Sequence, residues 1–317
     1  MDLYEYFAQN LPAERLRRDE PMSAHTSFRI GGPAEVMFLP ENESEVARAA
    51  MLAREAGCGV TFIGRGSNLL VRDGGIAGLV IAFAEAYSGI AVQGNILRAR
   101  AGDTLTHLAN AALEAGLTGL EFASGIPGSV GGGMAMNAGA YGGELKDVAV
   151  SARLMDMASG EIKQLDADEL EMGYRTSRAL RTGQLVLEAT FELRIGDKSE
   201  IKAKMDELNA RRREKQPLNY PSAGSTFKRP EGFFAGALIE QAGLKGLRVG
   251  GAQVSTKHAG FIVNTGGASA GDVEALIGLV TEKVFAQSGV RLEPEVRIVG
   301  ENGGFSSFRS GRPKAGR

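Results

Sequence analysis

One stretch of the chain, Ser124 to Gly143, constrains the fold more than any other. It reads SGIPGSVGGGMAMNAGAYGG, so it holds eight glycines and no Asp, Glu, Lys or Arg. Apolar residues such as Ile126, Val130 and Met134 stand between the glycines, which is not the composition of a solvated linker. Glycine adopts positive φ without strain, and successive backbone N–H groups in such turns bind anions. The stretch therefore predicts either a packed loop against a phosphate-bearing ligand or a tight turn region that binds nothing.

A second glycine-bearing loop, GRGSNLLV at residues 64–71, favours the first of these alternatives. It follows an apolar run over residues 60–63 that reads as a buried strand. Arg65 stands between two glycines, and Ser67 and Asn68 add a hydroxyl and an amide that suit phosphate oxygens. Two such loops together predict a pyrophosphate that is held from two sides.

Length and composition narrow the class of protein. At 317 residues the chain is long enough for two or three domains, and its 44 glycines are about double the usual ~7%. The 36 Lys and Arg residues nearly balance the 38 Asp and Glu residues, so no overall field favours nucleic acid. The single cysteine, Cys58, excludes an internal disulfide and a thiolate cluster, and the three histidines lack metal-ligand spacing. We therefore expect neither a metal nor a nucleic-acid partner.

Several common motifs are missing from the sequence. No predicted strand is followed by GxGxxG, Gly-Lys never occurs, and neither HExxH nor CxxC is present. These absences argue against a Rossmann dehydrogenase, a P-loop NTPase and a zinc hydrolase. The acidic N-terminus does not resemble a signal peptide, and no uncharged apolar run approaches the ~18 residues of a transmembrane helix. We therefore expect a cytoplasmic protein with no membrane insertion.

Hydrophobic periodicity and capping signals predict the order of helices and strands. Helices are expected over residues 1–20, 42–57, 104–116, 199–215 and 272–289. Strands are expected as a glycine-closed pair within 26–40, and over 60–63, 79–83, 97–100, 148–157, 160–165, 185–193 and 290–299. The period changes at residues 196–200, which predicts a domain boundary there, and residues 301–317 have the composition of a disordered tail. The pattern indicates an α+β architecture in layers.

Seven short segments, in their order along the chain, resemble the UDP-N-acetylenolpyruvoylglucosamine reductase family. They are TSFRIGG from Thr26, GRGSNLLV from Gly64, GIPGSVGG from Gly125, NAGAYGGE from Asn137, GYRTSR from Gly173, AGSTFKRP from Ala223 and LEPEV from Leu292. The resemblance implies the two-subdomain FAD-binding fold of the p-cresol methylhydroxylase and vanillyl-alcohol oxidase type, plus a C-terminal α+β substrate-binding domain. The expected FAD-binding domain spans 1–198, with subdomains of about 1–84 and 85–198. The expected substrate-binding domain spans 199–289, and a closing strand over 290–300 returns to the FAD domain.

The resemblance also implies a reaction. Members of the family use NADPH and FAD to reduce UDP-N-acetyl-enolpyruvoyl-glucosamine to UDP-N-acetylmuramate in peptidoglycan synthesis. Neither glycine loop holds a His or Cys that could carry a covalent flavin, so we expect non-covalent FAD. Two alternatives stay open: a flavin oxidase or dehydrogenase of the same fold that acts on another small molecule, and a nucleotide-sugar binding protein without catalysis. Oxygen uptake would favour the first alternative, and a colourless protein would favour the second.

Three polar residues match the catalytic positions of the family. Reduction of an enol ether of pyruvate needs a cation at the carboxylate and a proton donor at the α-carbon. Arg175 in GYRTSR suits a carboxylate, and the resemblance assigns proton donation to Ser225 in AGSTFKRP. It assigns Glu295 in LEPEV to orient Arg175 or relay a proton, although Glu293 would share the same strand face. Without the resemblance, each of these residues reads as an ordinary surface or turn residue.

The remaining candidate residues also come from the matched motifs. The flavin is expected along Gly64, Gly66, Ser67, Asn68, Leu69, Gly125, Ile126, Pro127, Gly128, Ser129 and Gly132, with Asn137 and Tyr141 as further candidates. The candidates for the substrate's uridine diphosphate are Lys215, Tyr220, Arg229, Gln253, Lys257, His258 and Asn264. His25 is expected either to touch the flavin or to be a structural histidine. Some relatives carry a tyrosine on an extra lid loop; this chain lacks the loop, and we expect Tyr220 to cover the substrate instead.

Overall fold

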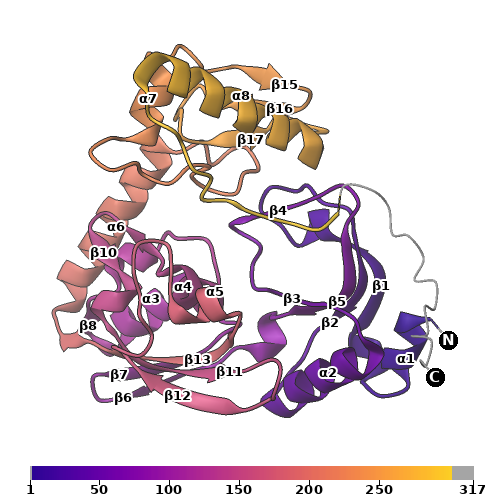
Figure 1. Cartoon of the computed structure of the whole chain (residues 1–317). Helices are drawn as coiled ribbons and strands as arrows, with labels where there is room; N and C mark the ends of the chain where they lie inside the picture. Colours follow the sequence, from indigo (N-terminus) through magenta and orange to yellow (C-terminus); the bar gives the residue numbers. More distant parts are fainter. Residues whose placement is uncertain (1, 302–317) are drawn as a thin grey trace.

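The computed structural model describes residues 2–301, which form three units, each with its own sheet (Figure 1). Each unit has a buried hydrophobic cluster, and two of these clusters extend into a neighbouring unit: Leu70 of the first unit packs in the cluster of the third, and Leu187 of the second packs in that of the first. Within these residues no helix is long and apolar enough to cross a membrane. Apart from Glu301, the tail predicted over 301–317 lies outside the described residues.

The first unit is a four-stranded sheet in the order β1-β2-β5-β3 with two helices packed beside it. Its elements are α1 (Leu3–Ala8), β1 (Leu16–Pro21), β2 (Pro33–Phe38), α2 (Glu43–Ala56), β3 (Val60–Ile63), β4 (Leu69–Val71) and β5 (Ile76–Ala82). β1 runs antiparallel to β2, whereas β5 runs parallel to both β2 and β3. α2 begins after the cap of Asn42 and ends at Gly57 in the left-handed conformation, as its sequence predicts.

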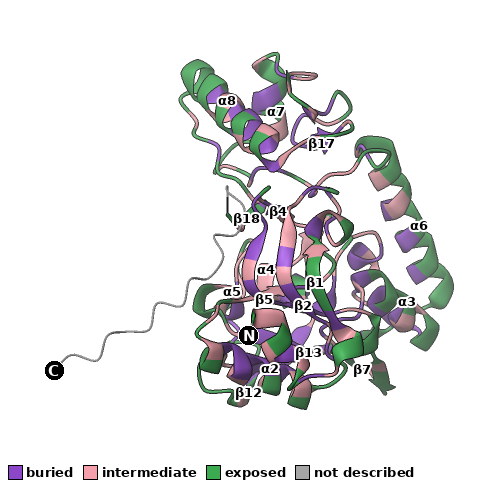
Figure 2. Cartoon of the chain, turned by 90° about the vertical axis from the view of Figure 1, so that its right-hand side faces the viewer, coloured by how far each residue is buried: buried purple, intermediate pink, exposed green. Residues whose placement is uncertain are grey.

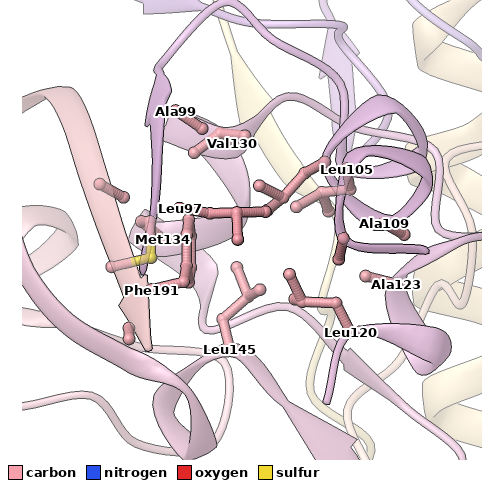
Figure 3. Packing of buried hydrophobic residues seen from close by; sticks show 14 of the residues in the cluster. Leu97, Ala99, Leu105, Ala109, Leu120, Ala123, Val130, Met134, Leu145 and Phe191 are labelled. Carbon is pink, nitrogen blue, oxygen red and sulfur yellow. The ribbon is translucent and has the colours of Figure 1, made fainter. Parts of the chain in front are cut away.

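The second unit is a five-stranded antiparallel sheet in the order β12-β11-β13-β7-β6. Its elements are β6 (Ile90–Gln93), β7 (Ile96–Arg100), α3 (Leu105–Ala115), β8 (Leu117–Thr118), α4 (Val130–Met136), β9 (Gly139–Ala140), β10 (Gly143–Glu144), β11 (Ala149–Met155), β12 (Ile162–Asp166), α5 (Arg178–Thr182), β13 (Leu185–Glu192) and β14 (Arg194–Ile195). The helices α3 and α4 place Leu105, Val130 and Met134 against Leu97 and Phe191 of the sheet (Figure 3). This packing holds the glycine-rich segment against the sheet.

The helix α6 (Lys198–Lys215) leads from the second unit to the third and is exposed along its outer face (Figures 1 and 2). Its buried residues Ile201, Met205 and Leu208 belong to the core of the second unit. We therefore propose that the third unit begins near Gln216 and not at residue 199, because a helix belongs with the core that it completes.

The third unit packs two helices on a three-stranded sheet in the order β15-β16-β17. Its elements are α7 (Ala235–Gln241), β15 (Arg248–Val249), β16 (Ala252–Val254), β17 (Ile262–Asn264) and α8 (Ala270–Ser288). The chain then returns to the first unit, where β18 (Arg297–Val299) pairs parallel with β4. Only this part of the strand predicted over 290–299 is regular. The preceding segment instead pairs irregularly with residues 226–228, so Glu293 meets Lys228 in solvent while Glu295 is turned inward.

Three local predictions are wrong. The helix predicted over residues 1–20 ends at Ala8, and the chain continues as β1 after Pro12. The predicted strand pair within 26–40 does not form, because β2 pairs with β1 and residues 26–32 are irregular. The glycine-rich run is not loop throughout, because residues 130–136 form α4. Glycine disfavours a helix by about 1 kcal/mol per residue, and burial of the apolar residues of α4 offsets that cost.

Candidate active site

A cleft of about 290 Å³ opens where the two glycine loops meet. A side chain at Gly64 would place its Cβ 2.0 Å from the Oγ of Ser129 in the other loop. A side chain at Gly66, which has φ +58°, would place its Cβ 2.0 Å from the carbonyl oxygen of His25. The two loops therefore touch at Gly64, the segment with His25 packs on Gly66, and both positions require glycine.

Most of the residues predicted to bind the flavin line this cleft. They are Gly64, Gly66, Ser67, Asn68, Leu69, Ile126, Pro127, Gly128, Ser129 and Gly132. Three others lie outside its lining. Gly125 packs beneath the side chain of Asn209, Asn137 is fully buried, and Tyr141 lies exposed beside the guanidinium of Arg211. His25 binds Glu20 with a distance of 2.7 Å between Nε2 and Oε1, which favours the structural role.

The lining fits a dinucleotide with a pyrophosphate. The glycines leave room along the backbone, and Arg65, Arg212 and Arg297 line the same cleft. Within residues 2–301, none of these three guanidinium groups forms an ion pair, so their charge is available to an anion. In the same part of the chain, no group of three or more His, Cys, Asp or Glu residues is placed to hold a metal.

Arg175, Ser225 and Glu295 meet where this cleft joins a second cleft of about 380 Å³, and all three line both clefts. The Nε of Arg175 lies 2.8 Å from the Oε1 of Glu295. The same guanidinium donates to the carbonyl oxygens of Asn137 at 3.4 Å and Gly139 at 3.2 Å. The structure thus brings together three residues that are far apart in sequence.

Hydrogen bonds to the backbone hold the segments of the serine and the glutamate beside the flavin loop. The N–H of Glu295 donates to the carbonyl of Thr226, the residue after Ser225, at 2.8 Å. The side-chain amide of Asn68 donates to the carbonyl of Glu295 at 3.2 Å, and the N–H of Arg297 donates to the carbonyl of Asn68 at 3.0 Å. Both chemical groups are therefore positioned by the loop that lines the flavin cleft.

The electrostatics of the pair depend on burial. Burial raises the pKa of Glu295, and the nearby Arg175 guanidinium opposes that rise without cancelling it. The side chain of Glu295 is 14% exposed and that of Arg175 is 19% exposed. The ion pair is therefore mostly buried, but both residues still line the two clefts.

Asn137 supports Arg175 from below and does not face the cleft. Its Nδ2 donates to Glu144 at 3.1 Å and to the carbonyl of Gly173 at 3.0 Å, and its Oδ1 accepts from the N–H of Lys146 at 3.0 Å. Its backbone has φ +45°, a conformation that asparagine tolerates better than most residues. We therefore propose that Asn137 positions Arg175 and does not bind the flavin.

The second cleft is bounded by aromatic and cationic side chains of the third unit and the turn before Arg175. The guanidinium of Arg229 lies 4.0 Å from the ring centre of Phe234, and the backbone N–H of Arg229 donates to the hydroxyl of Tyr174 at 3.0 Å. Lys257 and His258 also line this cleft, and burial lowers the pKa of His258. The cleft therefore combines flat apolar surfaces with cations.

Of the predicted substrate residues, Arg229, Lys257 and His258 line the second cleft. Asn264 is buried, and its side-chain amide donates to the carbonyl of Phe28 at 3.2 Å. Lys215 and Tyr220 are exposed outside both linings, and Gln253 donates to the carbonyl of Gly246 at 3.2 Å. The lining residues that the sequence did not predict include Tyr174, Arg212, Gln216 and Phe234. Tyr174 stands inside the GYRTSR motif and could have been found there. Arg212 could not, because its charge run is equally typical of a solvated helix face.

The fold and the cleft define a flavoenzyme with a separate substrate domain. Residues 34–166 match the family model described as "FAD binding domain", and residues 216–299 match "UDP-N-acetylenolpyruvoylglucosamine reductase, C-terminal domain". These matches confirm the predicted FAD-binding α+β fold and the FAD cofactor.

Whole-chain comparisons identify the family. The chain is 53% identical to the UDP-N-acetylenolpyruvoylglucosamine reductase of Agathobacter rectalis, over 92% of this chain and 96% of the relative. It is 48% identical to the reductase of the same name from Clostridioides difficile, over 95% and 99% of the two chains. The solved UDP-N-acetylenolpyruvylglucosamine reductase of Thermus caldophilus superposes with a TM-score of 0.78 at 37% identity, covering 90% of this chain and 98% of that one. The chain belongs to the UDP-N-acetylenolpyruvoylglucosamine reductase family.

Proposed function

We propose that this protein reduces the enolpyruvyl group of UDP-N-acetyl-enolpyruvoyl-glucosamine to a lactyl ether, with NADPH as reductant, in cytoplasmic peptidoglycan synthesis. The observation that carries the proposal is the junction of the two clefts, where Arg175, Ser225 and Glu295 meet. When bound, FAD supplies the hydride that NADPH provides. The protein's own residues supply orientation, charge and a proton.

Arg175 provides the cation for the substrate's carboxylate. A guanidinium has five N–H donors. In Arg175, three of them donate to Glu295, Asn137 and Gly139. The remaining donors are available to a carboxylate in the cleft. Negative charge that develops on the α-carbon spreads into this carboxylate, so the fixed cation stabilises the transition state more than the substrate. Glu295 keeps the guanidinium in place.

Ser225 provides the proton at the α-carbon. Ser225 is exposed and lines both clefts, and its hydroxyl has no hydrogen-bond partner within residues 2–301. The preceding Gly224 has open space where a side chain would stand, which leaves room for the substrate. The serine therefore faces the position where a reacting carbon would lie between the flavin cleft and the substrate cleft.

The second cleft suits the nucleotide half of the substrate. Arg229 and Lys257 supply cations for a diphosphate, and the rings of Tyr174 and Phe234 supply flat surfaces for a base or sugar. Tyr174 and Phe234 are 48% and 61% exposed, so both are available to close over a bound ligand. We assign to them the covering role that sequence reasoning gave to Tyr220.

The test separates the two half-reactions. In Ser225→Ala, NADPH should still bleach the flavin at an unchanged rate, whereas anaerobic re-oxidation by the enolpyruvyl substrate should fall by about 10²–10⁴-fold. Ser222→Ala, three residues away and outside both clefts, is the matched control. Survival of both half-reactions in Ser225→Ala would remove the serine from the mechanism. Oxygen uptake with a hydroxylated small molecule, in the absence of the nucleotide sugar, would favour an oxidase instead.

Steady-state kinetics give a second test. If NADPH and the nucleotide sugar use the same side of the flavin in turn, double-reciprocal plots should be parallel, as in a ping-pong mechanism. Intersecting lines would require both substrates to be bound at once and would contradict a single shared cleft.

A further inference from the structure

Two polar residues at the end of α6 line the flavin cleft without protein partners. The Oε1 of Gln216, the residue that ends the helix, is buried and accepts no hydrogen bond. The guanidinium of Arg212, one turn earlier, forms no ion pair or hydrogen bond within residues 2–301, and burial lowers its pKa. Its Cδ lies 3.3 Å from the Cβ position of Gly125, so it packs directly on the glycine-rich segment.

These two groups differ from the other polar groups of the same cleft. Arg175 is paired with Glu295, and Arg65 and Arg297 are exposed to water. The buried acceptor of Gln216 costs about 1–3 kcal/mol while it has no donor, and the half-buried guanidinium of Arg212 lacks an anion within residues 2–301. The last turn of α6 is therefore suited to a ligand that presents a hydrogen-bond donor to Gln216 and a negatively polarised atom to Arg212.

The chemistry of the ligand narrows the choice. A phosphate would satisfy Arg212, but it has only acceptors to offer the carbonyl of Gln216. The pyrimidine edge of an isoalloxazine has an N3–H donor flanked by two carbonyl oxygens, which matches both residues. Reduction of the ring places negative charge on the N1–C2 carbonyl side of that edge, where a cation tunes the cofactor's electronics.

We propose that Gln216 accepts a hydrogen bond from the flavin N3–H and that Arg212 donates to the C2 carbonyl side of the ring. The proposal rests on the FAD of the proposed function and adds one residue that tunes its reduction potential and one that orients its ring. Arg212 then binds the reduced flavin more tightly than the oxidised flavin. The protein thereby raises the flavin's reduction potential, and Gln216 fixes the ring's orientation in the cleft.

The first experiment measures the flavin midpoint potential in Arg212→Met, with Arg213→Met as the matched control. Arg213 is the next residue on the same helix, is exposed and lines neither cleft. We expect Arg212→Met to weaken binding of the reduced flavin about tenfold more than binding of the oxidised flavin, which lowers the potential by about 30 mV. Arg213→Met should leave the potential unchanged. Equal weakening of both redox forms would place a phosphate at Arg212, and no change would remove Arg212 from the flavin site; either result overturns the proposal.

The second experiment tests Gln216 by binding alone. The unaltered protein should bind 3-methyl-FAD about tenfold less tightly than FAD, because the methyl group removes the N3–H donor. Gln216→Ala should bind the two flavins about equally. Undiminished discrimination in the variant would show that N3–H meets another group. If Gln216→Ala instead lost the ability to discriminate between FAD and FMN, Gln216 would contact the adenine and not the isoalloxazine. Neither measurement uses the nucleotide sugar, so failure of the catalytic proposal and failure of this one are distinguishable.

Discussion

Arg175 and Arg212 line the same flavin cleft, yet the protein surrounds them in opposite ways. Arg175 has Glu295 at 2.8 Å and two backbone carbonyls, and it stands on a turn held by the buried Asn137. Arg212 has no such partners in the described part of the chain, and its neighbour Gln216 keeps an unused buried acceptor. One wall of the cleft is complete in the free protein, and the other wall is not.

The contrast indicates two ways of preparing a site. On the Arg175 side, charge is fixed before substrate arrives, so little reorganisation is needed when charge develops in the transition state. On the α6 side, the protein leaves a donor and an acceptor whose satisfaction depends on a ligand, so the free energy of pairing them contributes to binding. Mutations on the two walls should therefore affect different quantities.

The largest effect is expected from Arg175→Lys. An ammonium group cannot keep both Glu295 and a substrate carboxylate in planar contact, so kcat should fall by about 10²–10³-fold. Affinity for FAD should change little, because the flavin loops are untouched. Arg178→Lys, on α5 and outside both clefts, is the control. If Arg175→Lys also lost its FAD, Arg175 would contribute to flavin binding as the α6 residues do, and the two sides of the cleft would not differ in function.

The pH dependence of turnover should report Glu295. Because burial raises its pKa, this carboxylate takes up its proton at a higher pH than an ordinary glutamate. The ion pair with Arg175 is therefore lost as pH falls through that raised pKa, and activity should decline about tenfold per pH unit below it. In Arg175→Lys, the guanidinium's hydrogen bond no longer lowers the pKa, so the acidic limb should move to higher pH. If the acidic limb of the pH profile disappears in Glu295→Gln, the limb belongs to Glu295. If it persists in that variant, another group causes it.

A smaller effect is expected from Asn137→Gly, which keeps the backbone conformation at φ +45° but removes three side-chain hydrogen bonds. Stability to urea should fall by about 2–4 kcal/mol, because buried donors and acceptors lose their partners. Re-oxidation of the flavin by substrate should slow by about tenfold as Arg175 becomes less ordered. Flavin reduction by NADPH should not change; an equal loss in both half-reactions would mean that Asn137 supports the whole cleft and not Arg175 in particular.

The smallest effect is expected on the other wall and has the opposite sign. Gln216→Leu removes a buried acceptor that has no partner, so the FAD-free protein should gain about 1 kcal/mol of stability. The added stabilisation on FAD binding should shrink, because the variant offers the flavin no acceptor. Thermal unfolding with and without FAD measures both terms, with the exposed Gln93→Leu as control. Destabilisation of the FAD-free variant would show that Gln216 is already satisfied without a ligand.

Local signals predicted some elements to within a residue. The helices α2 and α3 are bounded by their own caps, Asn42 with Gly57 and Thr104 with Gly116. These boundaries could be predicted because the capping hydrogen bonds join residues at most four positions apart. The same reasoning failed for α4, whose glycines disfavour a helix and whose buried residues depend on a sheet that combines the earlier strand β7 with the later strand β13.

The sequence by itself determined the two glycine loops, the capped helices and the motifs that carry Arg175, Ser225 and Glu295, because these depend on residue type and short-range hydrogen bonds. Only the tertiary structure decided that Glu295 and not Glu293 turns toward Arg175, and that Arg212 and Gln216 lack partners. Pairing and burial depend on which distant segments meet. The spacing of residues along one chain does not contain that information until the three units have packed together.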